Sequence, residues 1–308
     1  MRQLVILSGK GGTGKTTVAG AFIRLSGTLA CADCDVEAPN LHLVNSRYPS
    51  REVDPYFALP LAEIDPVRCI SCGQCQSVCR FDAVIPGNPF QVDTLSCEGC
   101  SVCTLVCPAE AIRMKPHHAG KMTLYRNRDA VFSTAELNMG AGTSGLLVSQ
   151  VKKSMNAAAK ADIPFAIVDG SPGIGCPVIA TLSGADAVLI VAEPSLSGIS
   201  DLERVVKTAR GFGARLAVCV NKANINPDRT KEIREYCERE SLFFAGVIPY
   251  DPLAIAAVNR GVTVVDLPCP SGQAVEKIYR RVLPMFSAAQ PSPCTSAGPV
   301  EITKRGYK

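Results

Sequence analysis

Short runs of apolar residues recur along the chain, separated by longer segments in which apolar positions repeat with a helical period. The runs occupy residues 3–7, 28–32, 165–168, 187–192, 216–220 and 243–248. Because each run is apolar throughout, the runs suit strands of a parallel sheet whose two faces are both covered by helices. They therefore predict six strands of a central sheet.

Helix-patterned segments separate these runs. Two of them carry a clear apolar stripe, and the segment 228–241 is charged and amphipathic. The stripes consist of Val18, Phe22 and Leu25 in the first segment and of Leu202, Val205, Val206 and Ala209 in the second. Strands that alternate with helices at this spacing predict an α/β fold with a doubly wound, mostly parallel sheet.

Residues 60–115 break this pattern. Cysteines crowd together there, the helical period disappears and prolines punctuate the segment. We interpret 60–115 as an inserted domain, so that the α/β domain is discontinuous and consists of residues 1–59 and 116–288. The composition then turns to Ala, Pro, Ser and Gly, which predicts a flexible tail at 289–308.

The composition bounds the class of protein. Hydrophobic residues make up 47% of the 308-residue chain and charged residues 19%, as in soluble globular proteins. The net charge of +4 is modest and no basic stripe stands out, so we expect no nucleic-acid partner. No apolar stretch reaches transmembrane length, and the run at 3–7 is too short for a signal-peptide core. We expect a cytoplasmic protein without stable membrane insertion.

A glycine-rich motif follows the first predicted strand. It reads GKGGTGKT and a predicted helix begins at its end, which is the context of a phosphate-binding loop. Glycines let backbone N–H groups turn onto phosphate oxygens, and the helix N-terminus favours their negative charge. Lys15 is expected to reach the β- and γ-phosphates of a nucleotide, and the Thr16 hydroxyl to ligate Mg²⁺. The predicted nucleotide-binding residues of this segment are Gly9, Lys10, Gly11, Gly12, Thr13, Gly14, Lys15, Thr16 and Thr17.

A second lysine, Lys10, gives the loop a deviant form. The sequence KGGTGKTT resembles the phosphate-binding loop of the MinD, ParA, Mrp and nitrogenase iron-protein superfamily of ATPases. In that family the extra lysine contacts phosphate across a nucleotide-sandwich dimer. The resemblance therefore implies a homodimer that forms on ATP binding, with Lys10 and Lys15 as catalytic residues. A solvated surface lysine is the alternative for Lys10.

Two further segments resemble the switch regions of the same superfamily. The first reads DCD at 33–35, followed by NLH at 40–42. There the resemblance assigns to Asp35 the catalytic role of orienting the attacking water and places Asp33 near the magnesium ion. The strand at 165–168 ends at Asp169, as a Walker B strand does, which implies a Mg²⁺ contact through water. The Gly173 N–H would then contact the γ-phosphate. Three further residues, Asn221, Pro249 and Asp251, resemble those that contact adenine in the family.

Two cysteine runs lie inside the inserted segment. Both have the spacing C-x2-C-x2-C-x3-C; Pro108 follows the second run, whereas Arg80 follows the first. The pattern is similar to that of bacterial two-cluster ferredoxins, in which each 4Fe–4S cluster takes three cysteines from one run and the fourth from the other. The predicted ligand sets are Cys69, Cys72, Cys75 and Cys107 for one cluster and Cys79, Cys97, Cys100 and Cys103 for the other. Pairs of C-x2-C also suit tetrahedral Zn²⁺, which is the alternative.

The remaining cysteines lie outside these runs. Cys31 and Cys34, at an odd offset on a predicted strand, are expected on opposite faces as buried structural thiols, and Cys219 likewise. Cys176 occupies a place similar to one cluster-binding cysteine of the nitrogenase iron protein, but the second expected cysteine is missing from 138–145. We therefore predict no cluster between subunits. Cys176 is either a nucleotide-gated thiol at the dimer interface or a packing residue.

The resemblance implies an ATPase that binds ATP, ADP, Mg²⁺ and two 4Fe–4S clusters, and it leaves three functions open. In the first, which complete thiolate ligation favours, the clusters pass electrons to a partner protein. In the second, the protein assembles or delivers metal clusters, as Mrp-type relatives do. In the third, it is a positioning ATPase like MinD with structural clusters. The expected partner of the first two is a redox or metal-cofactor protein, and proteins with a molybdenum-containing centre are one class of such partners.

Overall fold

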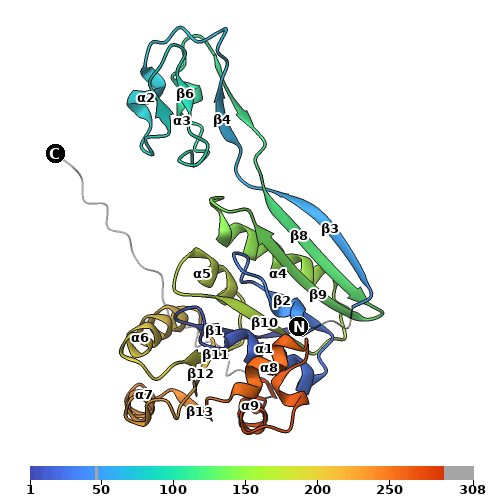
Figure 1. The fold of residues 1–308 in the computed structure, drawn as a ribbon. Coiled ribbons are helices and arrows are strands. Elements are labelled where there is room, and N and C mark those ends of the chain that lie inside the picture. Colours follow the sequence, from blue (N-terminus) through green and yellow to red (C-terminus); the bar gives the residue numbers. More distant parts are fainter. Residues whose placement is uncertain (46–47, 288–308) are drawn as a thin grey trace, which may run out of the picture.

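A nine-stranded sheet forms the centre of the molecule in a computed structural model that describes residues 1–45 and 48–287 (Figure 1). The tail predicted at 289–308 lies outside the described residues. In spatial order the strands are β13 (Phe243–Ile248), β12 (Arg215–Asn221), β11 (Ala187–Ala192), β1 (Arg2–Ser8), β10 (Phe165–Pro172), β2 (Ala30–Asp33), β9 (Ala130–Leu137), β8 (His118–Asn127) and β3 (Ser50–Phe57). The strands from β13 to β9 run parallel to one another. β8 pairs antiparallel with β9 on one side and with β3 on the other. The prediction of a mostly parallel α/β sheet is confirmed.

Three strands of this sheet are not predicted by the apolar pattern. β3 and β8 lie at the edge, where β3 is exposed at all but one position and β8 is only partly buried. β9 is buried over most of its length, but Ser133 and Thr134 interrupt its apolar residues. An edge strand does not need an unbroken apolar run because one side of it meets water. The pattern therefore detects six parallel strands of the sheet and misses the parallel strand β9 together with the antiparallel pair β8 and β3.

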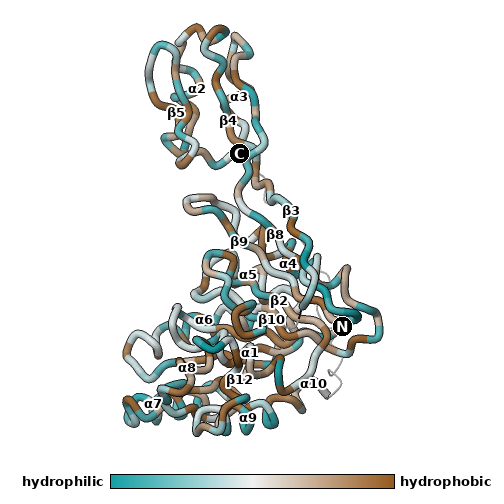
Figure 2. Tube along the Cα trace, turned by 45° about the vertical axis from the view of Figure 1, so that its right-hand side comes forward, coloured by the Kyte–Doolittle hydropathy of each residue, from teal (hydrophilic) through white to brown (hydrophobic). Residues whose placement is uncertain are grey.

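Helices cover both faces of the sheet. The longer ones are α1 (Lys15–Ser26), α4 (Ser144–Ala158), α5 (Cys176–Leu182), α6 (Leu196–Arg210), α7 (Pro227–Arg239), α8 (Pro252–Asn259) and α9 (Pro270–Val282), and the short α10 (Pro284–Ser287) follows. One core packs the sheet against α4, α5, α6 and α7, and the other packs it against α1 and α9. Successive residues of β1 alternate between the cores, as side chains on a strand must: Val5 lies in the first and Ile6 in the second. Figure 2 shows the apolar segments gathered along these central strands.

Residues 61–115 form a small unit at the far end of β3 and β8, here called the cysteine-rich unit (Figure 1). Its elements are β4 (Leu61–Ile64), α2 (Gln74–Val78), β5 (Val84–Ile85), β6 (Gln91–Val92), α3 (Val102–Leu105) and β7 (Ile112–Lys115). β4 pairs with β7 and β5 with β6, so the unit contains two small antiparallel sheets. Ala62, Ile64, Cys75, Val84 and Ile112 form its buried apolar cluster, and Ala83 and Ala111 are buried as well. The strands β3 and β8, paired from Ser50–Arg126 to Phe57–His118, carry the chain to this unit and back.

Within the described residues, no helix combines the length and the apolar character needed to cross a membrane. 

The strand that carries the chain back from the cysteine-rich unit has a site with no room for a side chain. Gly120 of β8 pairs with Tyr56 on β3 and with Leu137 on β9, and a Cβ at this position would lie 2.3 Å from the Glu136 carbonyl oxygen. We expect Gly120→Ala to lower the free energy of unfolding by about 1–3 kcal/mol, because two backbones must separate to admit the methyl group. Chemical denaturation measures this. Gly175→Ala is the control, since a Cβ there would meet its nearest neighbour at 3.6 Å; an equal loss in both variants would contradict the explanation.

Candidate functional site

The glycine-rich loop connects β1 to α1 and turns its backbone around the first residues of the helix. Gly12 and Gly14 have φ angles of +77° and +90°, a region that side chains with a Cβ rarely adopt. α1 begins at Lys15, directly after the left-handed Gly14. The hydroxyl of Thr13 is buried and has no hydrogen-bond partner among the described residues. A loop of this shape, with a free buried hydroxyl, suits an anion with several oxygens.

The first two residues of α1 are bound to Asp169, which lies within β10, since the strand continues beyond the predicted end at Asp169 to Pro172. The Lys15 ammonium donates to Asp169 Oδ1 at 2.6 Å, and the Thr16 hydroxyl donates to Asp169 Oδ2 at 2.6 Å. Asp169 is fully buried and Lys15 nearly so. The structure thus brings together three residues predicted for phosphate and magnesium binding. Asp169 occupies both of its oxygens with groups that a Mg²⁺–phosphate complex would also contact.

Two aspartates from the segment after β2 complete this cluster. Asp35 lies 3.7 Å from the Lys15 ammonium, and Asp33 is beside Asp169 because β2 and β10 pair at these two residues. Burial and the neighbouring Asp169 raise the pKa of Asp33 to about 7, although Lys15 and backbone N–H groups oppose the shift. Burial also raises the pKa of Asp35. Burial alone would lower the pKa of Lys15, but the carboxylates, Asp169 first, raise it. Three carboxyl groups face one ammonium, which is a charge balance suited to a divalent cation.

Asp33 has a further role that its sequence position does not reveal. Its Oδ1 accepts from the Asp35 N–H at 3.0 Å, and its Oδ2 accepts from Asn40 at 3.0 Å and Leu41 at 2.9 Å. The carboxylate thereby fixes the loop that carries Asp35. Gly173, predicted to contact the γ-phosphate, donates its N–H to the Ser8 carbonyl at 3.0 Å. That amide must leave Ser8 before it binds another group.

A cavity of about 370 Å³ lies beside the loop and is lined by all three residues predicted to contact adenine, Asn221, Pro249 and Asp251. Asn221 donates from Nδ2 to the Thr13 carbonyl at 2.7 Å, so it also supports the loop. Asp251 caps α8 and accepts from Ser271, which leaves its carboxylate largely occupied by protein groups. The cavity therefore joins the glycine-rich loop to the ends of β12 and β13.

Lys10 does not extend freely into solvent. Its ammonium pairs with Glu193 Oε2 at 2.9 Å, and Lys222 pairs with the other oxygen of Glu193, also at 2.9 Å. Lys222 in addition donates to the Gly12 carbonyl at 3.2 Å. The sequence patterns did not single out Glu193 or assign a role to Lys222. Their position is the signal that could have found them. Both lie just after predicted strands of a parallel sheet, and binding residues gather at the carboxyl ends of such strands.

The cysteine-rich unit has an internal repeat in its backbone as well as in its cysteines. Asp65 and Asp93, each four residues before a cysteine run, both accept from the N–H two residues later, at 2.9 Å and 3.0 Å. Left-handed φ angles recur at matching places in the two halves, in the pairs Ser71 and Gly99, Gly73 and Ser101, and Asp82 and Glu110. The two cysteine runs therefore lie in loops of equivalent backbone conformation.

The eight cysteines line two separate hollows, and each hollow contains one predicted set. Cys69, Cys72, Cys75 and Cys107 line the first, a hollow of about 20 Å³. Cys79, Cys97, Cys100 and Cys103 line the second, which is also about 20 Å³. In each hollow the fourth thiol comes from the other run of the sequence. Hydrogen bonds from backbone N–H groups, that of Ser71 first, lower the pKa of Cys69 and so favour its thiolate.

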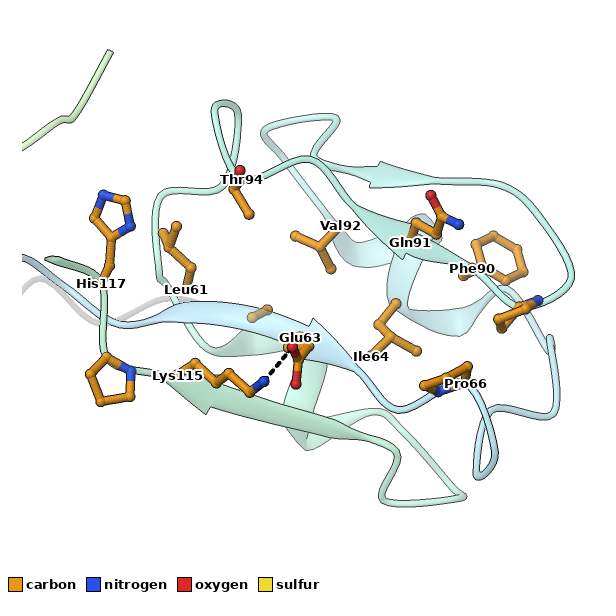
Figure 3. A pocket seen from close by; sticks show the side chains of 13 residues that line it. Leu61, Glu63, Ile64, Pro66, Phe90, Gln91, Val92, Thr94, Lys115 and His117 are labelled. Atoms are coloured by element: carbon orange, nitrogen blue, oxygen red, sulfur yellow. Dashed lines mark hydrogen bonds and ion pairs between the residues drawn. The ribbon is translucent and has the colours of Figure 1, made fainter. Parts of the chain in front are cut away.

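Among the described residues, no three His, Cys, Asp or Glu side chains gather in the way that the ligands of a single metal ion do. The thiols are instead spread over the walls of the two hollows. Another cavity of the unit, about 490 Å³, has no cysteine in its lining (Figure 3). It lies between β4 and residues 89–94, and the ion pair of Lys115 with Glu63 crosses one wall. It shares Ile64 and Phe90 with the first hollow.

The other cysteines fall into two groups. Cys31, Cys34 and Cys219 are buried, and Cys31 and Cys34 lie in different cores on opposite faces of the sheet, as predicted. Burial raises the pKa of Cys34 and of Cys219 to about 12, so these thiols stay protonated. Cys176 is exposed at the start of α5 and lies close to Gly145 of α4, where a Cβ would approach the Cys176 Cβ to 3.0 Å.

Comparisons with known proteins agree with this geometry. The family model for the CobQ/CobB/MinD/ParA nucleotide binding domain matches residues 4–264. An uncharacterized protein of Methanocaldococcus jannaschii is 32% identical over 228 residues, 73% of this chain and 79% of the relative. An iron–sulfur cluster carrier protein of Methanococcus maripaludis is 27% identical over 135 residues, 40% of this chain and 47% of the relative. The structure of the septum site-determining protein MinD of Pyrococcus horikoshii with Mg-ADP has a TM-score of 0.55 at 17% identity, covering 91% of this chain and 95% of that one.

The contact between Asn221 and the glycine-rich loop gives a direct test of the cavity. We expect Asn221→Asp to weaken ATP binding by about tenfold or more, because a carboxylate would face the Thr13 carbonyl, leave it without a donor and repel phosphate. Isothermal titration calorimetry measures the affinity. Asn259→Asp places the same charge on α8 in the lining of the same cavity and is the matched control. An equal loss in the two variants would mean that charge alone, and not the contact with the loop, is responsible.

Proposed function

The chain belongs to the CobQ/CobB/MinD/ParA family of nucleotide-binding domains, and on this basis we propose that it is an ATP-hydrolysing dimer that couples its nucleotide state to two 4Fe–4S clusters. The clusters would serve electron transfer to a partner protein. Nucleotide binding follows from the family, and relatives of the ParA and MinD type are ATPases. The clusters, the coupling and the partner are the proposed part.

In the nucleotide half, the proposal gives each residue a role that its contacts support. ATP phosphates would take Lys15 and Thr16 from Asp169, and Mg²⁺ would meet Thr16 and the carboxylate that they release. Asp35, 3.7 Å from Lys15, would position the attacking water, and its raised pKa suits a group that meets a proton in the reaction. Lys10 would stabilise the charge that develops on the phosphate oxygens.

In the cysteine-rich unit, one observation carries the proposal: each hollow is lined by one of the two thiol sets that the ferredoxin-like spacing defines. Four thiols that line one hollow are the ligand set of a cubane cluster, which would supply one-electron transfer when bound. The chain contributes backbone N–H groups that stabilise thiolates, as at Cys69, and the Ala111 N–H donates to Cys107 Sγ at 3.3 Å. Cys72 and Cys100 are the exposed members of their sets, so each hollow has a side that a partner can approach.

A chain of contacts leads from the nucleotide site to the cysteine-rich unit. Asp169 lies on β10, and the segment that follows β10 leads to Cys176 at the start of α5, which packs against Gly145 of α4. The loop before α4 then reaches the second cysteine run: a Cβ at Gly140 would lie 3.4 Å from Leu95, and one at Gly142 would lie 3.9 Å from the Glu98 carboxylate. The loop before α4 is thus a neighbour of the second cysteine run, and this is the route by which a movement at Asp169 would reach the hollow of Cys97 and Cys100.

A second function is favoured by one of the comparisons. The iron–sulfur cluster carrier protein of Methanococcus maripaludis matches a part of this chain, and its name describes a protein that carries clusters to others. Under that function the thiol sets would hold a cluster in transit. Four thiolates per set favour retention over release, so we place electron transfer first.

The crossed ligand sets can be tested by pairs of cysteine substitutions. We expect the anaerobically purified chain to contain about eight iron and eight sulfide ions. Cys75→Ser with Cys107→Ser, two changes in one hollow, should remove about four of each. Cys75→Ser with Cys79→Ser, two changes in one run, should remove nearly all, because these thiols line different hollows. Iron and acid-labile sulfide analysis with electron paramagnetic resonance gives the content; equal losses from the two pairs, or zinc in place of iron, would refute the assignment.

The coupling itself is tested by a redox titration under anaerobic conditions. We expect the reduction potential of the iron–sulfur centres to differ by about 50–100 mV between ADP and a non-hydrolysable ATP analogue, as a typical coupling free energy implies. Lys15→Ala should abolish both ATP turnover and this shift, because it removes the cation that meets the phosphates. The same potential in both nucleotide states would remove the electron-transfer proposal, and a shift that persists in Lys15→Ala would place the nucleotide elsewhere.

A further inference from the structure

We propose that Glu193 is a positioning residue: it holds Lys10 on its own subunit and determines how readily this lysine moves from Glu193 to a phosphate. The inference rests on the proposed function, in which Lys10 binds ATP phosphates in a dimer. It concerns a residue outside the glycine-rich loop and outside both switch segments.

The ammonium of Lys10 finds all three of its acceptors in residues 193–197. It contacts Glu193 Oε2 at 2.9 Å, Ser195 Oγ at 3.4 Å and Ser197 Oγ at 3.2 Å. An ammonium group has three N–H donors, so these three acceptors satisfy it. Ser195 is itself fixed, because its Oγ caps α6 by accepting from the Gly198 N–H at 3.0 Å. Lys10 is therefore docked in a defined place.

Glu193 holds a second lysine at the same time. Its Oε1 accepts from Lys222 at 2.9 Å, and Lys222 also donates to the Gly12 carbonyl of the glycine-rich loop. Burial acts to raise the pKa of Glu193, but the bonds from Lys222 and Lys10 lower it below its ordinary value. The carboxylate is thus ionised at neutral pH and lies between two cations next to the loop.

Because Glu193 pairs with two lysines, the release of Lys10 has a small free-energy cost. A partly buried carboxylate that lost its only cation would be left uncompensated, which is costly. Glu193 keeps Lys222 when Lys10 departs, and Lys222 stays anchored on Gly12. Phosphate oxygens can therefore compete for Lys10 alone. In the absence of nucleotide, the same contacts keep the lysine from presenting its charge to a second subunit.

The test uses Glu193→Gln in the full chain, which keeps the shape of the side chain and removes its charge. We expect two results, each of about fivefold, the size of one partly exposed ion pair. Without nucleotide, Lys10 should become more reactive in competitive acylation read by mass spectrometry. With a non-hydrolysable ATP analogue, the dissociation constant of the dimer, measured by analytical ultracentrifugation, should fall.

Two further variants separate positioning from a general structural role. In a Lys10→Ala background, Glu193→Gln should no longer change the dimer dissociation constant, because only an effect that does not pass through Lys10 would persist there. Glu276→Gln breaks an exposed ion pair with Arg280 on α9 and should leave both readouts unchanged. Ser197→Ala removes one weaker acceptor of Lys10 and should raise its acylation by a smaller factor, which keeps the test available if Glu193→Gln does not fold.

The outcomes distinguish this inference from the proposed function. A wild-type chain that stays monomeric with the ATP analogue would refute the proposed dimer, and acylation of Lys10 would still decide whether Glu193 restrains it. A wild-type chain that dimerises, with unchanged acylation or an unchanged or weaker dimer in Glu193→Gln, would overturn the inference alone. Increased acylation together with a tighter dimer that depends on Lys10 supports it.

Discussion

The contact between Lys15 and Asp169 is the interaction on which the candidate site depends. At 2.6 Å, and with both groups buried, it ties the start of α1 to β10 and so fixes the end of the glycine-rich loop against the sheet. A buried carboxylate and a buried ammonium are each costly alone, and together they offset that cost only while they stay in contact. A nucleotide that takes over Lys15 must therefore compensate Asp169, and a divalent cation does so. The need for a metal ion with the phosphates follows from this balance of charge.

The sequence predicts the parallel strands other than β9 because each of them is buried and apolar on both faces, whereas Ser133 and Thr134 interrupt β9. The same physics explains what it misses. β3 is exposed over nearly all of its length, so its residues follow no apolar run. In the site, Lys15, Thr16 and Asp169 were predictable because their motif sets both spacing and residue type. Glu193 and Lys222 were not, because they meet the loop through the tertiary fold: Glu193 lies at the end of β11 and Lys222 follows β12.

The cysteine-rich unit shows the opposite balance between sequence and packing. Few of its residues are buried, namely Ala62, Ile64, Cys75, Ala83, Val84, Ala111 and Ile112, which is little apolar surface for a segment of this length. Burial in such a small core offsets only part of the conformational entropy of its loops, and bound metal commonly supplies the rest in small domains. Each hollow is lined by thiols from both runs, so the two halves of the unit meet at both hollows.

The pairing of β3 with β8 has a consequence for how such a chain could arise. The two strands that lead to and from the cysteine-rich unit lie side by side, and their last pairs, Tyr56 with Gly120 and Phe57 with His118, bring the ends of the segment together. A segment with adjacent ends occupies the place of a hairpin turn. Such a segment can be lengthened, shortened or replaced without changing the order or register of the strands behind it, so the architecture is modular: the cysteine-rich unit meets the nucleotide-binding domain at a single ladder.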